Sequence, residues 1–151
     1  MSAYDQLIKL ANLKPEEGMD KEAADNKTLN IAKTLSIAAN VKAIHVKTKS
    51  YSKHMALDDA FKAFNKTIDK FNECVQGYYR RKDGKRLDLK NPEIKFTLPD
   101  DDKVMEAIEK LEDDFREASD ALVKGVSPLI SLQDDVLNDF YQLYYRLDLK
   151  G

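Results

Sequence analysis

Apolar residues recur along most of the chain in alternating steps of three and four positions, the spacing that places them on one face of an α-helix. The pattern occupies four segments, about residues 26–47, 54–77, 101–124 and 127–147. The second segment is the most regular, and its inward positions are Leu57, Phe61, Phe64, Ile68, Phe71 and Val75. We therefore predict four long helices, each with one apolar face turned toward a shared core.

The other three segments have similar apolar stripes. The first contains Leu29, Ile31, Leu35, Ile37, Ala38, Val41 and Ile44. The third contains Val104, Ile108, Leu111, Phe115, Ala118 and Leu122, and the fourth Leu129, Leu132, Val136, Phe140, Leu143 and Leu147. Residues 25–28 offer capping side chains for the first helix, Gly77 and Gly125 are predicted stops, and Ser127–Pro128 is a predicted start.

The lengths of the connections predict the topology. The first two helices and the last two are joined by short connections, which favour antiparallel hairpins. The middle connection has about 25 residues and reaches about 80 Å when extended, whereas a 24-residue helix is about 36 Å long. It can run the whole length of the bundle, so we predict an all-α, ferritin-like four-helix bundle with one long crossover over residues 26–151. Residues 1–25 are predicted to form an N-terminal arm or short helix.

Composition narrows the class of protein. The 151 residues are 42% hydrophobic and 34% charged with a net charge of −2, which is typical of one globular domain with much surface helix. Cys74 is the single cysteine, so an intrachain disulfide is excluded and a reducing compartment is favoured. No apolar run approaches 18 residues and no secretory signal pattern opens the chain, so we expect a cytoplasmic protein without a membrane span.

Metal-ligating residue types gather around the first predicted hairpin. The two histidines of the chain, His45 and His54, stand nine positions apart, and Asp69 and Glu73 follow on one face of the second predicted helix. Asp69 lies about 22 Å along the helix axis from His54, too far for one metal ion bound within a single chain. A second copy with its helix antiparallel to the first would bring the two ends together, giving two equivalent sites per dimer.

The spacing His54-x14-Asp69-x3-Glu73, with a further histidine upstream, resembles the intersubunit ferroxidase signature of the Dps mini-ferritins. The stretches "KTKSY" and "IDKFNECVQG" are similar to the corresponding stretches of that family, and the resemblance covers about residues 29–77. It implies a homo-oligomer, at least an antiparallel two-fold dimer, that binds iron through His45 and His54 of one subunit and Asp69 and Glu73 of its partner. It also implies ferroxidase activity.

The compact arrangement also resembles short Dps-like chains encoded by tailed phages, which implies the host cytoplasm or the virion as location. Imidazole and carboxylate ligands suit Fe(II) or Zn(II), so zinc stays open beside iron. Asp58, four residues after His54, is the expected acceptor for the other ring nitrogen of that histidine.

Other features favour a second hypothesis, a catalytically silent bundle that serves as a structural or protein-interaction protein. The histidines are nine positions apart where the mini-ferritins have twelve, and Val46 stands where that family has tryptophan. Four lysines also surround the predicted hairpin and disfavour a bound cation: Lys42, Lys47, Lys49 and Lys53.

A basic segment lies in the predicted crossover, next to Tyr78 and Tyr79. Its cations are Arg80, Arg81, Lys82, Lys85 and Arg86. Such a mixture of cations and aromatic rings is found where proteins contact nucleic acid, so weak DNA binding is a third hypothesis. The alternative for this segment is a solvated loop whose cations pair with neighbouring acids.

Overall fold

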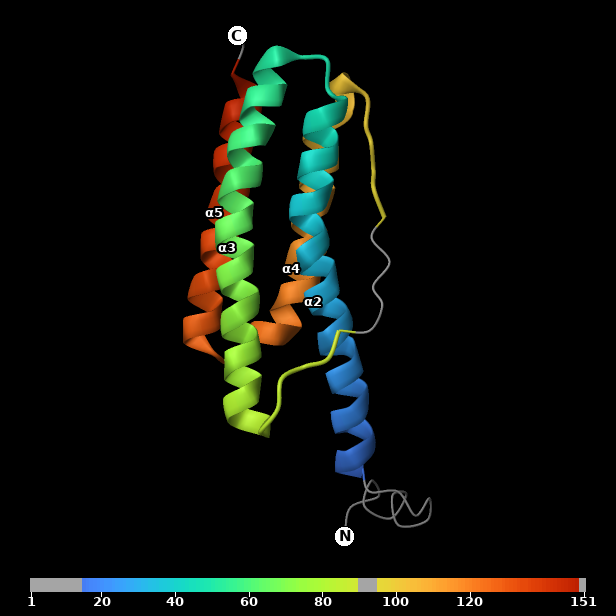
Figure 1. The fold of residues 1–151 in the computed structure, drawn as a ribbon, viewed down its shortest axis with the longest axis vertical. Helices are drawn as coiled ribbons and strands as arrows, with labels where there is room; N and C mark the ends of the chain where they lie inside the picture. The colour runs from blue at the N-terminus through green and yellow to red at the C-terminus, as the bar shows by residue number, and fades with distance from the viewer. Residues whose placement is uncertain (1–14, 90–94, 150–151) are drawn as a thin grey trace.

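The computed structural model describes residues 15–89 and 95–149, and it places side chains from Ile31 onward. Within these ranges the chain is all-α, with four long helices, one short 3-10 helix and no strand (Figure 1). The elements are α2 (Pro15–Lys47), α3 (Tyr51–Asp83), η1 (Asp101–Lys103), α4 (Val104–Val123) and α5 (Ser127–Asp148). Of the N-terminal arm or short helix predicted for residues 1–25, residues 1–14 lie outside the described part of the chain, and the remainder belongs to α2.

The helices form a bundle in which α2 and α5 each pack against both α3 and α4. The pairs α2–α3 and α4–α5 are antiparallel hairpins with short turns (Figure 1). The chain between α3 and α4 starts at the far end of α3, where Gln76 bonds the backbone of Leu87 in both directions, at 2.7 and 2.8 Å. It ends beside the α2–α3 turn, where the Lys47 ammonium donates to the carbonyl of Leu98 at 3.1 Å. The predicted crossover along the bundle is therefore present.

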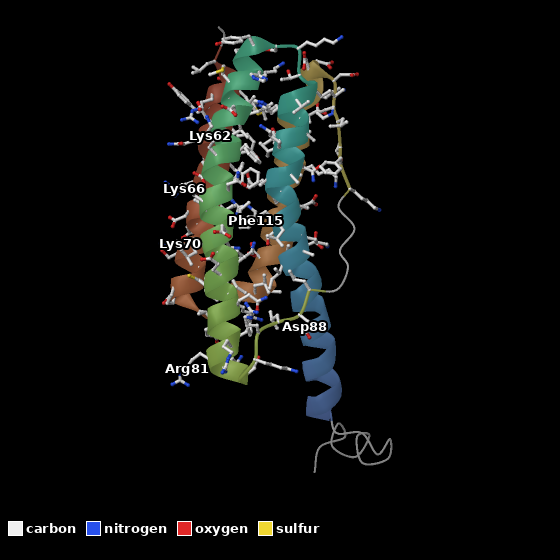
Figure 2. All side chains as sticks on the ribbon, viewed as in Figure 1. Lys62, Lys66, Lys70, Arg81, Asp88 and Phe115 are labelled. Atoms are coloured by element: carbon white, nitrogen blue, oxygen red, sulfur yellow. The ribbon has the colours of Figure 1, made fainter. Side chains whose placement is uncertain are left out.

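Four phenylalanines fill the centre of the bundle, and all are fully buried. The rings of Phe64 and Phe140 lie 4.6 Å apart between centroids, and those of Phe71 and Phe115 lie 5.7 Å apart. These rings come from α3, α4 and α5, whose predicted inward faces are confirmed; the label of Phe115 in Figure 2 lies between the ribbons. Burying such rings is the main stabilising contribution to a core of this kind.

Four predicted core positions are less buried than expected. Leu35 is 43% exposed, so its assignment to the core is wrong. Phe61, Leu132 and Leu147 are only partly buried and pack on the edge of the core. The apolar arc of α2 is broad, and periodicity alone does not tell which edge of such an arc meets the neighbouring helices.

Two helix boundaries differ from the predicted ones. Helix α2 begins at Pro15, about ten residues before the predicted cap, because proline is compatible with the first turn of a helix. Helix α3 continues through Gly77 and ends at Gly84, which has φ = 81°. Gly77 is tolerated inside the helix, whereas the left-handed backbone at Gly84 favours glycine. The cations at positions 80–82 therefore belong to the last turn of α3, where they face the negative end of the helix dipole.

The start of α3 has a side-chain cap, whereas the cap predicted for α5 is wrong. Ser50 caps α3, and its hydroxyl accepts a hydrogen bond from the Lys53 amide at 3.3 Å. The cap of α5 is Val126, so Ser127 is the first helical residue and makes no capping bond. No described helix has the length and apolar character needed to cross a membrane.

Candidate functional site

His45 and His54 meet at the closed end of the α2–α3 hairpin. Their ring centroids are 3.9 Å apart and the ring planes are inclined by 32°. The Nδ1 atom of His45 lies 3.2 Å from the carbonyl oxygen of His54, and the Nδ1 atom of His54 lies 3.2 Å from the carbonyl oxygen of His45. The two residues thus form a reciprocal pair, which we call the histidine clasp, in which each ring reaches across to the backbone of the other helix.

The clasp determines the chemistry of both rings. A carbonyl oxygen only accepts hydrogen bonds, so each Nδ1 atom must carry a hydrogen and donate it. In the neutral rings, each Nε2 atom then carries a lone pair. No described residue donates a hydrogen bond to either Nε2 atom. An imidazole whose Nδ1–H is held by a backbone carbonyl is the form in which histidine commonly binds a metal ion through Nε2.

The clasp also completes the last turn of α2. The carbonyls of a final helical turn lack partners within the helix. His54 supplies the partner for the carbonyl of His45, and the Thr48 amide bonds the carbonyl of Ile44 at 3.0 Å. A structural role for the two histidines is therefore already present without any metal ion.

Asp58 has a different partner from the expected one. Its carboxylate pairs with the Lys62 ammonium at 3.0 Å, and this hydrogen bond is the main reason that its pKa lies below the usual value. The bond expected from His54 to Asp58 does not appear among the described contacts. The carbonyl of His45 takes the place of that carboxylate as the acceptor for His54.

A second polar cluster joins the α2–α3 hairpin to the segment that leads into α4. Asp101 accepts a hydrogen bond from the Thr48 hydroxyl at 2.6 Å and from the Lys49 amide at 3.1 Å. The Lys53 ammonium donates to the carbonyl of Asp101 at 2.6 Å. The Lys47 ammonium donates to the carbonyl of Pro99 at 2.7 Å. Three of the four lysines expected around the turn are therefore engaged with the chain leading into α4.

The predicted carboxylate ligands stand apart from the clasp. Asp69 and Glu73 are both exposed on α3, and Asp69 lies about 22 Å along the helix from His54. Among the described residues, no group of three or more histidine, cysteine, aspartate or glutamate side chains comes together around a point that could hold a metal ion. A single chain thus holds two imidazole nitrogens near the start of α3 and two carboxylates farther along the same helix.

The basic residues expected to contact nucleic acid are all exposed: Arg80, Arg81, Lys82, Lys85 and Arg86. They continue a line of cations along the outer face of α3, where Lys62, Lys66, Lys70 and Arg81 point away from the bundle (Figure 2). Tyr79 is buried, and its hydroxyl donates to the carbonyl of Leu122 at 3.0 Å, so its ring is not available to stack on a base. DNA binding here stays a prediction, to be tested by its loss with rising salt.

An apolar groove of about 740 Å³ runs along the outer side of the α2–α3 hairpin. The lining side chains include Leu35, Ala39 and Val46 of α2, Phe61 of α3, and Phe96 and Leu98 of the crossover. The Lys42 ammonium lies 4.9 Å above the Phe61 ring. The sequence analysis did not predict this groove, because its far wall comes from residues more than 30 positions away along the chain. The one indication in the sequence was that the apolar arc of α2 is broader than a single core contact requires.

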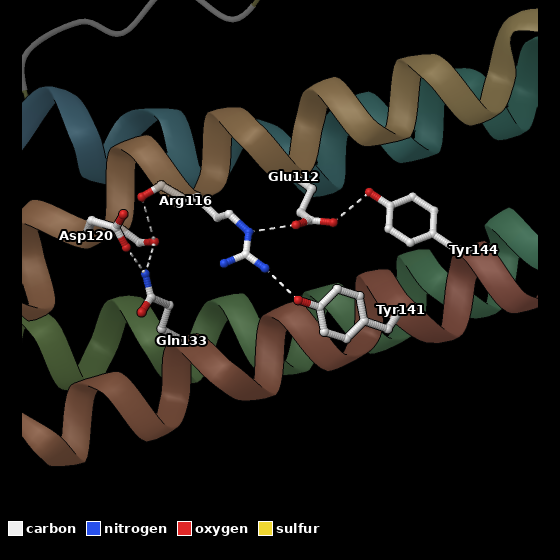
Figure 3. A network of polar contacts seen from close by, with 7 residues as sticks. Glu112, Arg116, Asp120, Gln133, Tyr141 and Tyr144 are labelled. Carbon is white, nitrogen blue, oxygen red and sulfur yellow. Dashed lines mark hydrogen bonds and ion pairs between the residues drawn. The ribbon is translucent and has the colours of Figure 1, made fainter.

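A polar network joins α4 to α5 on another side of the bundle (Figure 3). Glu112 is the centre: it accepts hydrogen bonds from the Tyr144 hydroxyl at 2.8 Å and from Nε of Arg116 at 2.6 Å. Arg116 also donates to the Tyr141 hydroxyl at 2.5 Å. Burial, followed by the bond to Glu112, raises the pKa of Tyr144 far above its usual range, so the phenol stays protonated. This network holds two helices together and presents no nucleophile.

Comparison with known proteins places these features in a family. The model of a family of unknown function, DUF5856, matches residues 45–147, from the first histidine of the clasp to the end of α5. A protein of Enterobacteria phage T4, described as the uncharacterized 14.6 kDa protein in the mobD–ri intergenic region, is 34% identical over 107 residues. That alignment covers 70% of this chain and 75% of the phage protein. No solved structure matches. The chain therefore belongs to the DUF5856 family.

Proposed function

We propose that this protein is a ferritin-like bundle that assembles as a two-fold dimer or larger homo-oligomer and binds a transition-metal ion, iron or zinc, at the subunit interface. The histidine clasp carries this proposal, because it leaves two Nε2 lone pairs without a partner among the described residues. The relative from phage T4 agrees with the expected resemblance to phage-encoded chains.

The donor set fits such a metal ion only when a second copy is present. His45 and His54 supply nitrogen ligands, and Asp69 and Glu73 supply oxygen ligands four residues apart on one face of α3. This mixture suits Fe(II) or Zn(II). In an antiparallel pair of α3 helices that brings His54 to Asp69 of the second copy, the two-fold axis passes midway between these two positions, next to Phe61. Phe61 lines the apolar groove, so such a pairing would cover the groove.

The residues of the chain would have separate tasks at this interface. The carbonyl oxygens of the clasp fix the tautomer and the direction of both rings, the groove excludes water around the axis, and Asp69 and Glu73 offset the charge of the cation. A bound iron ion would supply the oxidation chemistry of a ferroxidase.

Three observations favour a second candidate, a catalytically silent bundle that works through protein contacts. The groove exposes large apolar side chains, with Phe96 55% exposed and Leu98 51% exposed, as surfaces for protein partners often do. Lys42 and Lys47 also line this groove, so a cation bound nearby would meet two positive charges. Each histidine already has a structural partner.

Native mass spectrometry of the full chain after incubation with Fe(II) or Zn(II), with metal content measured in parallel, tests the two candidates. The metal proposal predicts a dimer or a larger even-numbered assembly that retains two ions per dimer. Asp69→Ala and His54→Ala are expected to remove the ions. Asp134→Ala, which removes an exposed carboxylate on α5, is the matched control and is expected to keep them. A monomer without bound metal would overturn the metal proposal and favour the silent bundle.

A further inference from the structure

A second cavity, of about 390 Å³, lies on the other side of the crossover, between α2 and α4. Its floor is apolar: Ile44 is 1% exposed, Leu111 is 9% exposed, and Ala107 of α4 also lines it. Ligand sites commonly combine an apolar floor with a few converging polar groups, and volumes from about 300 Å³ hold small organic molecules. The polar groups of this cavity therefore decide what it can hold.

Asn40 builds one wall. This amide is 3% exposed, donates to the carbonyl of Ser36 at 2.9 Å and accepts a hydrogen bond from the Thr97 amide at 3.2 Å. A buried side chain on α2 thus fixes the crossover at the edge of the cavity. An amide has two N–H hydrogens, and the bond to Ser36 uses one of them.

The extended crossover separates this cavity from the apolar groove. Lys95 and Thr97 line the cavity, whereas Phe96 and Leu98 line the groove. Alternate residues of an extended chain point to opposite sides, so these four crossover residues make a polar wall for one space and an apolar wall for the other. The two spaces can be altered independently by substitutions at alternate positions.

The charges at the rim favour an anion. Lys33, Lys95 and Lys110 line the cavity, together with Asp114 and Glu117. Lys110 lies 3.8 Å from Asp114, but Lys33 and Lys95 form no ion pair with any described residue. Two ammonium groups that have no ion pair among the described residues thus line this apolar-floored cavity.

We propose that this cavity binds a small organic anion, a carboxylate, sulfonate or phosphate ester with an apolar body. The body would lie on Ile44, Ala107 and Leu111, and the anionic group would pair with Lys33 and Lys95. This inference is independent of the metal proposal, because it uses none of the residues of the clasp and requires no second copy.

Titration of the full-length protein with the anionic dye 8-anilinonaphthalene-1-sulfonate in EDTA tests the cavity, because the dye joins an aromatic body to a sulfonate. We expect saturable binding of one dye per chain and no saturable binding of the cationic dye thioflavin T. The double variant Lys33→Glu/Lys95→Glu is expected to weaken the sulfonate dye at least about tenfold. Ala107→Phe, which fills the cavity without changing its charge, is expected to remove binding.

Matched variants separate this cavity from other apolar surfaces. Lys66→Glu/Lys70→Glu makes the same charge change on the exposed face of α3, and Phe96→Ser alters only the groove; both are expected to leave binding unchanged. Far-UV circular dichroism and the urea midpoint establish that each variant is folded. The proposal is overturned if the sulfonate dye shows no saturable binding, or if thioflavin T binds in a way that depends on Glu117. It is also overturned if Phe96→Ser removes binding of the sulfonate dye, or if the folded variants Lys33→Glu/Lys95→Glu and Ala107→Phe retain the wild-type affinity for it.

Discussion

His45 and His54 each donate the Nδ1 hydrogen to the main-chain carbonyl of the other, at 3.2 Å in both directions. The exchange joins the last turn of α2 to the first turns of α3 and stacks the two rings at 3.9 Å. A side chain that satisfies a helix-end carbonyl stabilises the helix end, and a second bond in the opposite direction fixes the angle of the hairpin. The clasp is thus both the structural closure of the hairpin and the basis of the proposed metal site.

Truncation of the clasp should lower stability. In His45→Ala, a side chain that is only 7% exposed is lost and the stacked ring of His54 loses its contact. We expect the free energy of unfolding to fall by about 2–3 kcal/mol, measured by urea denaturation in EDTA. Tyr51→Ala, at a position 78% exposed on the same hairpin, is the control and should change it by less than about 0.5 kcal/mol. Equal effects of the two substitutions would contradict the assigned role.

Tyr144 and Tyr141 offer a matched pair in the network between α4 and α5. The Tyr144 hydroxyl donates to Glu112, whose side chain is 14% exposed, whereas Tyr141 is itself 48% exposed. Tyr144→Phe should cost about 1–2 kcal/mol of unfolding free energy, because a hydrogen bond to a shielded carboxylate is lost. Tyr141→Phe should cost less than about 0.5 kcal/mol. Chemical denaturation of both variants measures this difference. A larger loss of unfolding free energy for Tyr141→Phe would contradict the prediction, because it would show that the exposed hydrogen bond is the stronger one.

A buried polar pair joins α2 to α3. The Thr34 hydroxyl lies 2.7 Å from the carbonyl of Ile31 and 2.8 Å from Oδ1 of Asn72, but it has one hydrogen to donate. The Nδ2 atom of Asn72 is buried and finds no acceptor among the described residues. Asn72→Leu has nearly the same shape and removes this unsatisfied amide, so we expect stability to rise by about 1 kcal/mol.

Thr34→Val is the complementary change at the same pair. It leaves the Asn72 amide without its only described partner, and it should cost about 1–3 kcal/mol. Combining both substitutions should restore stability to the wild-type value or above, since neither polar group is left alone. A double-mutant cycle by urea denaturation measures this coupling, and strictly additive effects would contradict it.

The carboxylate of Asp101 should make the stability of the protein dependent on acid. The hydrogen bond from Thr48, and after it the one from the Lys49 amide, lowers the pKa of Asp101 in the folded state. The contribution of this carboxylate to folding stability is therefore complete above the pKa that Asp101 has in the unfolded chain. It is lost as the pH falls through the lower pKa that Asp101 has in the folded state. Asp101→Asn should lower the melting temperature at pH 7, and the difference should shrink as the pH falls below about 4. Asp102→Asn, at an exposed position, is the control. A difference in melting temperature between Asp101→Asn and the wild type that stays constant with pH would contradict this prediction.

Asp139 should show the opposite dependence. Burial raises the pKa of this carboxyl, although the Thr67 hydroxyl donates to it at 2.7 Å. A raised pKa means that the contribution to stability is present at low pH and is lost as the pH rises through the folded-state pKa. Asp139→Asn keeps an acceptor for Thr67 without the buried charge, so it should melt higher than the wild type at pH 7 and equally near pH 3. Thermal melts at both values test this, with Asp134→Asn as the exposed control.

The helical segments, and the faces of α3, α4 and α5 that form the core, could be predicted from the apolar pattern of the sequence. Apolar steps of three and four positions express the geometry of a single helix, so Phe64, Phe115 and Phe140 could be placed without knowledge of their neighbours. The same reasoning brought His45 and His54 together, because a short turn between two helices leaves few arrangements. Local signals were weaker at boundaries: Gly77 predicted a stop that the helix passes, and Ser127 predicted a cap that Val126 provides.

The contacts that these groups make depend on how the helices and the crossover pack together. The hydrogen bonds of Lys47 to Pro99 and of Thr97 to Asn40 join residues more than 50 positions apart. The spacing of apolar residues within one helix does not predict contacts over such a separation. These hydrogen bonds place the crossover against α2, which creates the apolar groove on one side and the lysine-rimmed cavity on the other. The exchange of carbonyl bonds in the clasp likewise depends on the relative placement of two backbones. Helix formation is local, whereas a site between helices depends on the packing of the whole chain.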